Sequence, residues 1–146
     1  MMRRTYGAAQ KRGFTLIELV VVMTIIAILA GAAAVTVLDR IAKAKRARAL
    51  QDIKAYQTAI SLYAADNGEP PTQQQGLQAL WQKPSAPPIP RNWTRHYVEK
   101  AIGDDPWGNA YVYERASGSD EYVIRSYGKD GQPGGAGDNA DVSSNE

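Results

Sequence analysis

Three aspartates near the carboxyl end of the sequence are the residues whose type and spacing first suggest chemistry. Asp130, Asp138 and Asp141 lie in the glycine-rich stretch DGQPGGAGDNAD, at positions 1, 9 and 12 of its twelve residues. Hard cations such as calcium bind about six to eight oxygen ligands, and a glycine-rich backbone is able to wrap round them. Gly135 occupies position 6, as in an EF-hand, but positions 3 and 5 are glutamine and glycine, and no flanking helices are expected. The stretch therefore predicts either a calcium loop of another kind or a flexible polar terminus, and its spacing favours neither.

Glu18 raises the second chemical question, because it places a carboxylate inside the only long apolar run of the chain. Residues 14–38 contain no other charged side chain. An unpaired carboxylate in lipid is costly, so this residue needs a compensating group. A glutamate so near the start of a helix is able to stabilise the first turn against the helix dipole. Its position therefore predicts a helix-capping role.

The apolar run itself is long enough to be a membrane-spanning helix. It has 25 residues, and roughly 20 suffice for a helix to cross the hydrocarbon core. A cleaved secretory signal peptide is the alternative, but it has a shorter apolar core of about 7 to 15 residues. The run continues through the alanine-rich residues 30–34 into a helical pattern, which favours a transmembrane helix over residues 14–38. Four basic residues precede it: Arg3, Arg4, Lys11 and Arg12.

The helix is expected to continue well beyond the apolar run. Neither glycine nor proline occurs in residues 39–67, and apolar side chains recur there at spacings of three and four, which marks one face of a helix. The sequence therefore predicts one helix over residues 14–65, with a transmembrane first half. Its amphipathic second half belongs to a globular domain at residues 39–146. The residues of the apolar face are Ala49, Ile53, Tyr56, Ile60 and Tyr63.

The rest of the globular domain is predicted to consist of short elements and loops. Thr72 and Gln75 have the spacing of a capping box for a short helix that extends to Trp81, and the proline-rich residues 83–90 form an extended loop. Two alternating runs, residues 110–115 and 121–126, predict an antiparallel hairpin. We expect its apolar face, with Trp93 and Trp107, to cover the apolar face of the helix. The fold class is therefore α+β, with a long N-terminal helix and a small C-terminal antiparallel sheet.

Several classes of function are disfavoured by what the chain lacks. It has no cysteine, so neither a disulfide nor a thiolate metal site can form, and His96 is its only histidine. No nucleophile elbow or phosphate-binding glycine loop is present, so we expect no enzymatic activity. The basic run at residues 40–48 directly follows the apolar helix, which favours a solvated or head-group-facing surface over nucleic-acid binding.

The residues round Gly13 also carry a resemblance to a known superfamily. GFTLIE, residues 13–18, resembles the leader junction of type IV pilin-like proteins, which a prepilin peptidase cuts after the glycine and then methylates. Three later stretches resemble the major pseudopilins of type II secretion systems: ADNGEPPTQQQGLQALWQKP (residues 65–84), DPWGNAYVYE (residues 105–114) and SYGKDGQPGGAGDNADV (residues 126–142). The resemblance implies a leader at residues 1–13, cleavage after Gly13 and N-methylation of Phe14. One departure is Val35, where these proteins usually have a proline.

The same resemblance implies a structural subunit that polymerises. It predicts a homopolymeric filament that extends into the periplasm and helps push folded proteins across the outer membrane. Minor pseudopilins, the inner-membrane secretion platform and the prepilin peptidase are the implied partners. The subunit is expected to be a single-pass inner-membrane protein with its C-terminal domain in the periplasm. Within the filament, Glu18 is expected to meet the amino terminus of a neighbouring subunit, because a buried carboxylate and a buried ammonium are tolerable as a pair.

The resemblance also bears on the aspartates and on two alternative functions. Major pseudopilins bind calcium in this loop, which implies Asp130, Asp138 and Asp141 as ligands, with a backbone oxygen near Tyr127. One alternative is a type IV pilin for adhesion or motility, which would favour a C-terminal disulfide that this chain cannot form. The other is a monomeric, membrane-anchored module that binds a secreted ligand in a calcium-dependent way. That module would not need Glu18.

Overall fold

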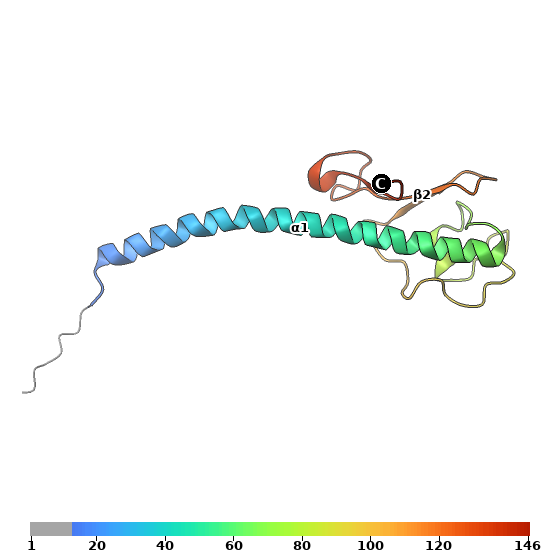
Figure 1. Ribbon diagram of the computed structural model, residues 1–146, viewed down its shortest axis with the longest axis horizontal. Coiled ribbons are helices and arrows are strands. Elements are labelled where there is room, and N and C mark those ends of the chain that lie inside the picture. The colour runs from blue at the N-terminus through green and yellow to red at the C-terminus, as the bar shows by residue number, and fades with distance from the viewer. Residues whose placement is uncertain (1–12) are drawn as a thin grey trace, which may run out of the picture. The chain divides into compact units, whose positions relative to one another are not determined.

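The computed structural model describes residues 13–146, apart from the side chains of residues 32–36. Helix α1 (Leu16–Asn67) is followed by the 3₁₀ helix η1 (Leu77–Leu80), strands β1 (Val112–Arg115) and β2 (Tyr122–Ser126), the 3₁₀ helix η2 (Gly137–Asn139) and strand β3 (Val142–Ser143) (Figure 1). The chain divides after Asp39 into two compact units, and α1 contributes to both. The predicted long N-terminal helix and small antiparallel sheet are thus confirmed. The predicted leader lies, up to residue 12, outside the described residues.

The described side chains of the first unit are exposed. Phe14 is 92% exposed and Leu16 81%, and the apolar side chains that follow them along α1 are also open to solvent. Thr24 is one of the few polar residues here, and its hydroxyl donates to the carbonyl oxygen of Val20 at 2.8 Å, within its own helix. In the part of the chain that the structure describes, no helix is both long and apolar enough to cross a membrane.

Helix α1 ends where the sequence supplies a glycine. Gly68 has a φ of +93°, a left-handed conformation that favours glycine, and its N–H donates to the carbonyl oxygen of Ala64 at 2.7 Å. The side-chain amide of Asn67 donates to the carbonyl oxygen of Tyr63 at 3.1 Å, which adds a side-chain bond within the last turn. The end of the helix is therefore two residues later than predicted.

The sheet has the strand order β1-β2-β3, and both pairings are antiparallel. Tyr113 pairs with Ile124 in the predicted hairpin, whose strands are slightly shorter than expected because Ala110 forms an isolated bridge with Asp104 instead. The third strand was not predicted: Val142 pairs with Ser126 of β2. With only two residues, β3 carries no alternating pattern that a sequence analysis could detect.

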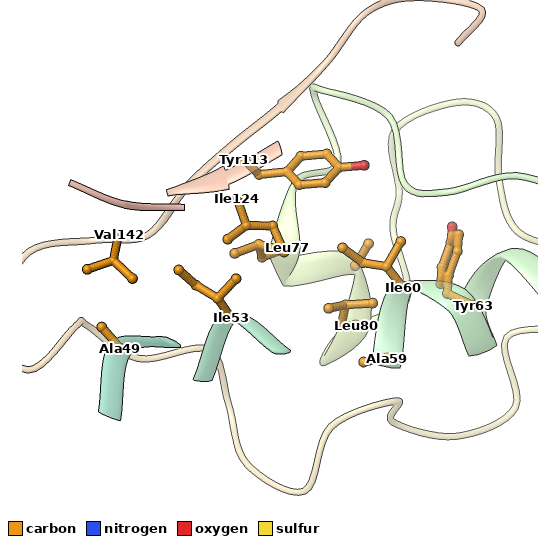
Figure 2. Close-up of a cluster of buried hydrophobic side chains, with 11 residues drawn as sticks. Ala49, Ile53, Ala59, Ile60, Tyr63, Leu77, Leu80, Tyr113, Ile124 and Val142 are labelled. Atoms are coloured by element: carbon orange, nitrogen blue, oxygen red, sulfur yellow. The ribbon is translucent and has the colours of Figure 1, made fainter. Parts of the chain in front are cut away.

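The core of the second unit lies between α1, η1 and the sheet (Figure 2). Ile53 and Ile60 of α1 are fully buried, as are Leu80 of η1, Ile124 of β2 and Val142 of β3. Burial of each such side chain stabilises the fold by about 1.5 to 3 kcal/mol. The hairpin therefore covers the apolar face of α1 as predicted, with Trp93 and Trp107 partly buried against the same cluster.

The predicted capping box forms, but the helix after it is of a different kind. The backbone N–H of Thr72 donates to the side chain of Gln75 at 3.1 Å, and the N–H of Gln75 donates to the hydroxyl of Thr72 at 3.3 Å. Gly76 then adopts a φ of +58°, so the chain makes a turn first and continues as the 3₁₀ helix η1. The side-chain amide of Gln75 also donates to the carbonyl oxygens of Ala86 and Pro88, both at 2.9 Å, and so secures the proline-rich loop.

Strand β1 is held by side chains that come from the segment after α1. The amide of Gln73 donates to the carbonyl oxygen of Tyr113 at 2.9 Å and accepts from the backbone N–H of Arg115 at 2.7 Å. The side chain of Arg115 is only 4% exposed and pairs with Glu69 at 2.9 Å. These contacts join the segment that follows α1 to the hairpin.

Candidate functional site

The glycine-rich loop, residues 128–141, begins two residues after the end of β2, and the buried carboxylate of Asp105 binds the segments next to its first residue. Asp105 Oδ1 accepts from the backbone N–H groups of Trp107 and Asn109, both at 2.9 Å, and Oδ2 accepts from the hydroxyl of Ser126 at 2.5 Å. The side-chain amide of Asn109 then donates to the carbonyl oxygen of Gly128 at 2.7 Å. The loop is therefore attached at its first residue to a neighbouring turn of the chain.

The loop closes on itself through its backbone. The N–H of Lys129 donates to the carbonyl oxygen of Asp138 at 2.9 Å. A Cβ at Gly128 would lie 2.8 Å from that same oxygen, and a Cβ at Gly135 would lie 2.5 Å from the carbonyl oxygen of Asn139. Both glycines have positive φ angles, +64° and +87°. The segment is thus a folded loop whose backbone oxygens lie against two glycines that leave no room for a side chain.

The three predicted ligands occupy different places in this loop. Both carboxylate oxygens of Asp141 accept from the N–H of Gly134, at 3.0 and 3.1 Å, and Asp130 Oδ1 accepts from the N–H of Gln132 at 3.1 Å. Asp138 lies in η2 and is exposed. Among the described residues, no three acidic or histidine side chains are gathered into a group that could hold a metal ion.

The donors of the loop nevertheless suit a hard cation in their chemistry. Carboxylates and backbone carbonyls are the oxygen ligands that calcium prefers, and the carbonyl oxygens of residues 138–140 turn toward the glycines of the same loop. Tyr127, whose backbone oxygen was predicted as a further donor, immediately precedes this segment. The calcium site stays a prediction.

Arg46 of α1 holds the other end of the loop, and the sequence analysis missed it. Its guanidinium donates to the carbonyl oxygen of Asp141 at 3.0 Å and to both carboxylate oxygens of Glu146 at 2.8 Å. Arg48 pairs with Asp52 at 3.0 Å. Arg48 thus stays on the solvated surface that was predicted, with its side chain 67% exposed, whereas Arg46 departs from that prediction because it binds the far end of the chain. Nothing in the sequence signals the contacts of Arg46 with Asp141 and Glu146, which are 95 and 100 positions away.

At the amino-terminal end of α1, Glu18 takes part in a capping box with Thr15. The Glu18 carboxylate accepts from the backbone N–H of Thr15 at 2.9 Å and from its hydroxyl at 3.0 Å. The N–H of Glu18 donates back to the Thr15 hydroxyl at 3.3 Å. The helix-capping role is therefore present in the single chain, and pairing with a neighbouring subunit stays a prediction. Gly13, the first described residue, has nothing within 4 Å of the position of a Cβ.

His96 lies in an aromatic cluster instead of a chemical site. Its ring stacks on Trp81 with centroids 4.1 Å apart, and Nδ1 lies 2.5 Å from the carbonyl oxygen of Trp81. Trp93 meets the same ring edge to face at 5.6 Å. These contacts give His96 a packing role.

Three features together define a type IV pilin-like subunit. A long helix starts just after a Gly-Phe junction, it carries a glutamate in its first turn, and a small antiparallel sheet packs on its second half. The prokaryotic N-terminal methylation motif matches residues 9–34, and the family described as type II secretion system, protein G, matches residues 36–145. The chain belongs to this protein G family.

Individual relatives agree with the family. Type II secretion system core protein G of Pseudomonas aeruginosa is 41% identical over 133 residues, covering 91% of this chain and 94% of that one. The same protein of Vibrio cholerae is 39% identical, with 91% and 90% covered. A crystal structure of the major pseudopilin from the type 2 secretion system of enterohaemorrhagic Escherichia coli matches with a TM-score of 0.59 and 33% identity, covering 70% of this chain and 87% of that one.

Family membership decides between the functions that the sequence left open. The members are structural pseudopilin subunits of a secretion system, so the chain is a structural protein and not an enzyme. It is a type II secretion pseudopilin, not a pilin for adhesion or motility.

Proposed function

We propose that the protein is made as a precursor, cleaved after Gly13 by a prepilin peptidase and methylated on Phe14. It then polymerises from the inner membrane into a periplasmic filament that helps push folded proteins across the outer membrane. The observation that carries this proposal is the apolar amino-terminal part of α1, whose described side chains are exposed in the single chain. The match of the N-terminal methylation motif across the junction supports the processing step.

Before assembly, residues 14–38 are proposed to anchor the subunit in the inner membrane as a single pass. This proposal rests on the whole 25-residue run in the sequence, with Glu18 as its one charged residue. The basic residues before the run favour a cytoplasmic amino terminus, which would leave the C-terminal domain in the periplasm.

In the filament, the exposed apolar side chains of α1 are proposed to pack against the same part of neighbouring subunits. This packing would keep the apolar side chains out of water once the subunit leaves the membrane. Glu18 would then exchange part of its capping contact with Thr15 for the amino terminus of a neighbour. Minor pseudopilins and the inner-membrane secretion platform are the further partners of this assembly.

The glycine-rich loop is proposed to bind calcium through Asp130 and Asp141, with Asp138 and a backbone oxygen near Tyr127 as additional donors. A bound calcium ion would neutralise the aspartates of the loop and hold its ends together. The folded loop and its inward carbonyl oxygens support this role.

Processing is the step that tests the proposal most directly. Gly13→Leu should block cleavage, so that the intact mass of the protein in membranes retains residues 1–13. Gly7→Leu is the matched control, because it makes the same change in the leader away from the junction and should leave processing intact. Filaments built from uncleaved wild-type chains, seen by mass measurement of purified filaments, would overturn the proposal.

A further inference from the structure

The glycine-rich loop is held from outside by two side chains, one at each end. At its carboxyl end, Arg46 reaches from α1 and donates to the backbone carbonyl oxygens of Asp141 at 3.0 Å and Ala140 at 3.5 Å. Its second nitrogen binds both oxygens of the Glu146 carboxylate at 2.8 Å, which fixes the planar guanidinium in one orientation. Because this ion pair is about two-fifths exposed, its contribution is geometric more than energetic.

These contacts fix Asp141 twice. Its backbone carbonyl is bound to Arg46, and its carboxylate accepts from the N–H of Gly134 on the opposite side of the loop. The direction in which the carboxylate leaves the backbone is therefore set by a residue of another element. Loss of Arg46 would free the backbone at Asp141, the aspartate whose carboxylate binds Gly134.

At the amino end, Asn109 has the corresponding position. Its side-chain amide donates to the carbonyl oxygen of Gly128, two residues before Asp130. The same side chain lies 3.1 Å from where a Cβ of Gly131 would be, so it packs directly against the backbone beside Asp130. Asn109 is itself held by the buried Asp105, which accepts its backbone N–H at 2.9 Å.

We propose that Arg46 and Asn109 are positioning residues that hold the two ends of the loop ready for calcium. The inference rests on the calcium binding proposed above. When a loop is already ordered, ligand binding does not have to supply the free energy of ordering it, so the affinity is higher. Side chains that orient metal ligands without touching the metal typically change affinity by about 10- to 100-fold when they are replaced.

Electrostatics and positioning predict opposite changes in calcium affinity when Arg46 or Asn109 is replaced, so one experiment can distinguish them. Arg46→Gln removes a positive charge near the loop, and Asn109→Asp adds a negative one, so Coulomb attraction alone would tighten calcium binding in both variants. Positioning predicts the reverse, because glutamine cannot reproduce the guanidinium fork and aspartate cannot donate to the Gly128 carbonyl. Arg46→Lys keeps the charge and loses the fork, and it should also weaken binding.

The experiment uses the full mature chain in detergent micelles, stripped of metal with a chelator and titrated with calcium chloride in a calorimeter. We expect Arg46→Gln, Arg46→Lys and Asn109→Asp each to bind calcium about 10-fold more weakly or worse. Arg48→Gln is the matched control, because it removes the same charge from the same helix but its partner is Asp52, not the loop. It should bind like the wild type.

Hydrogen exchange on the metal-free proteins supplies the second readout. The amides of residues 128–141 should exchange about 10-fold faster in the three variants, while amides near Ile53 in the core should not change. Wild-type protein that binds no calcium would overturn the proposed calcium function itself. Calcium binding by the wild type together with equal or tighter binding in Arg46→Gln and Asn109→Asp, or unchanged loop exchange, would overturn the positioning role alone.

Discussion

Gly134 and Gly135 allow the crowding inside the glycine-rich loop to be measured separately from backbone strain. Their φ angles are nearly the same, +94° and +87°. A Cβ at Gly134 would meet nothing within 4 Å, whereas one at Gly135 would lie 2.5 Å from the carbonyl oxygen of Asn139 and 2.9 Å from its carbonyl carbon. Alanine at either position therefore has the same backbone strain, but only Gly135→Ala forces two backbone segments apart.

The structure gives the size of the expected difference. The left-handed backbone costs about 1 to 3 kcal/mol in both variants. Overpacking adds about 1 to 3 kcal/mol more in Gly135→Ala, because the contacted atoms are backbone and cannot rotate away. Gly134→Ala keeps the N–H that donates to Asp141, so this control loses no hydrogen bond. A difference of about 2 kcal/mol between the variants corresponds to a roughly 30-fold difference in the population of the open loop.

Hydrogen exchange of the peptide that covers residues 128–141 measures this population directly. In metal-free full-length protein, its amides should exchange roughly 30-fold faster in Gly135→Ala than in Gly134→Ala. Amides of the core strands β1 and β2 serve as the internal control and should differ little. Equal loop exchange in the two variants would refute the reasoning, since it would mean that residues 135 and 139 do not touch.

Three further predictions concern the amino terminus, the metal and the pH dependence. Glu18→Ala should weaken the start of α1 by about 1 kcal/mol, because the capping box is lost. The variant should lower the yield of filaments strongly but should hardly change cleavage after Gly13, which the intact mass of the protein measures. Calcium in excess should raise the melting temperature of the full chain, and Asp130→Ala and Asp141→Ala should abolish that rise; a melt that is the same with calcium and with chelator would count against the site. Burial raises the pKa of Tyr63 and of Tyr113 from 10.0 to about 12. The native state therefore keeps protons that the unfolded chain loses, and the free energy of unfolding should fall between pH 10 and pH 12 by about 1.4 kcal/mol per pH unit for each tyrosine. Denaturant melts of Tyr113→Phe should show a shallower fall.

The regular parts of the fold were predictable because their patterns lie in consecutive residues. The spacing of Ile53 and Ile60 indicates the buried face of α1, and the absence of glycine and proline from residues 39–67 indicates that the helix can continue up to Gly68. Alternating residues on both sides of a polar turn indicate β1 and β2. These signals depend on the periodicity of each element, so they survive without any knowledge of its neighbours.

The contacts that form the loop were not predictable for the opposite reason. Arg46 and Asp141 are 95 positions apart, and neither residue differs in type from a surface residue. Nothing in the sequence around Asp105 indicates that this aspartate is buried or that its carboxylate holds the turn before β1. Strand β3 forms by pairing with the free edge of β2. Its two residues are too few for a pattern, so it can be identified only once the rest of the sheet is known.

The side chain of Gln73 covers the free edge of the sheet, which matters for a protein that we propose assembles with copies of itself. Strand β1 is at the edge of the sheet, and the outward carbonyl of Tyr113 and N–H of Arg115 are the groups with which a strand of another molecule would pair. One glutamine side chain makes both of these bonds and so takes the place of that strand. In a filament the subunits are concentrated together, so an open edge would invite lateral pairing between sheets. Gln73 would thus keep the sheet edge from competing with α1, the surface through which we propose that copies of the chain join.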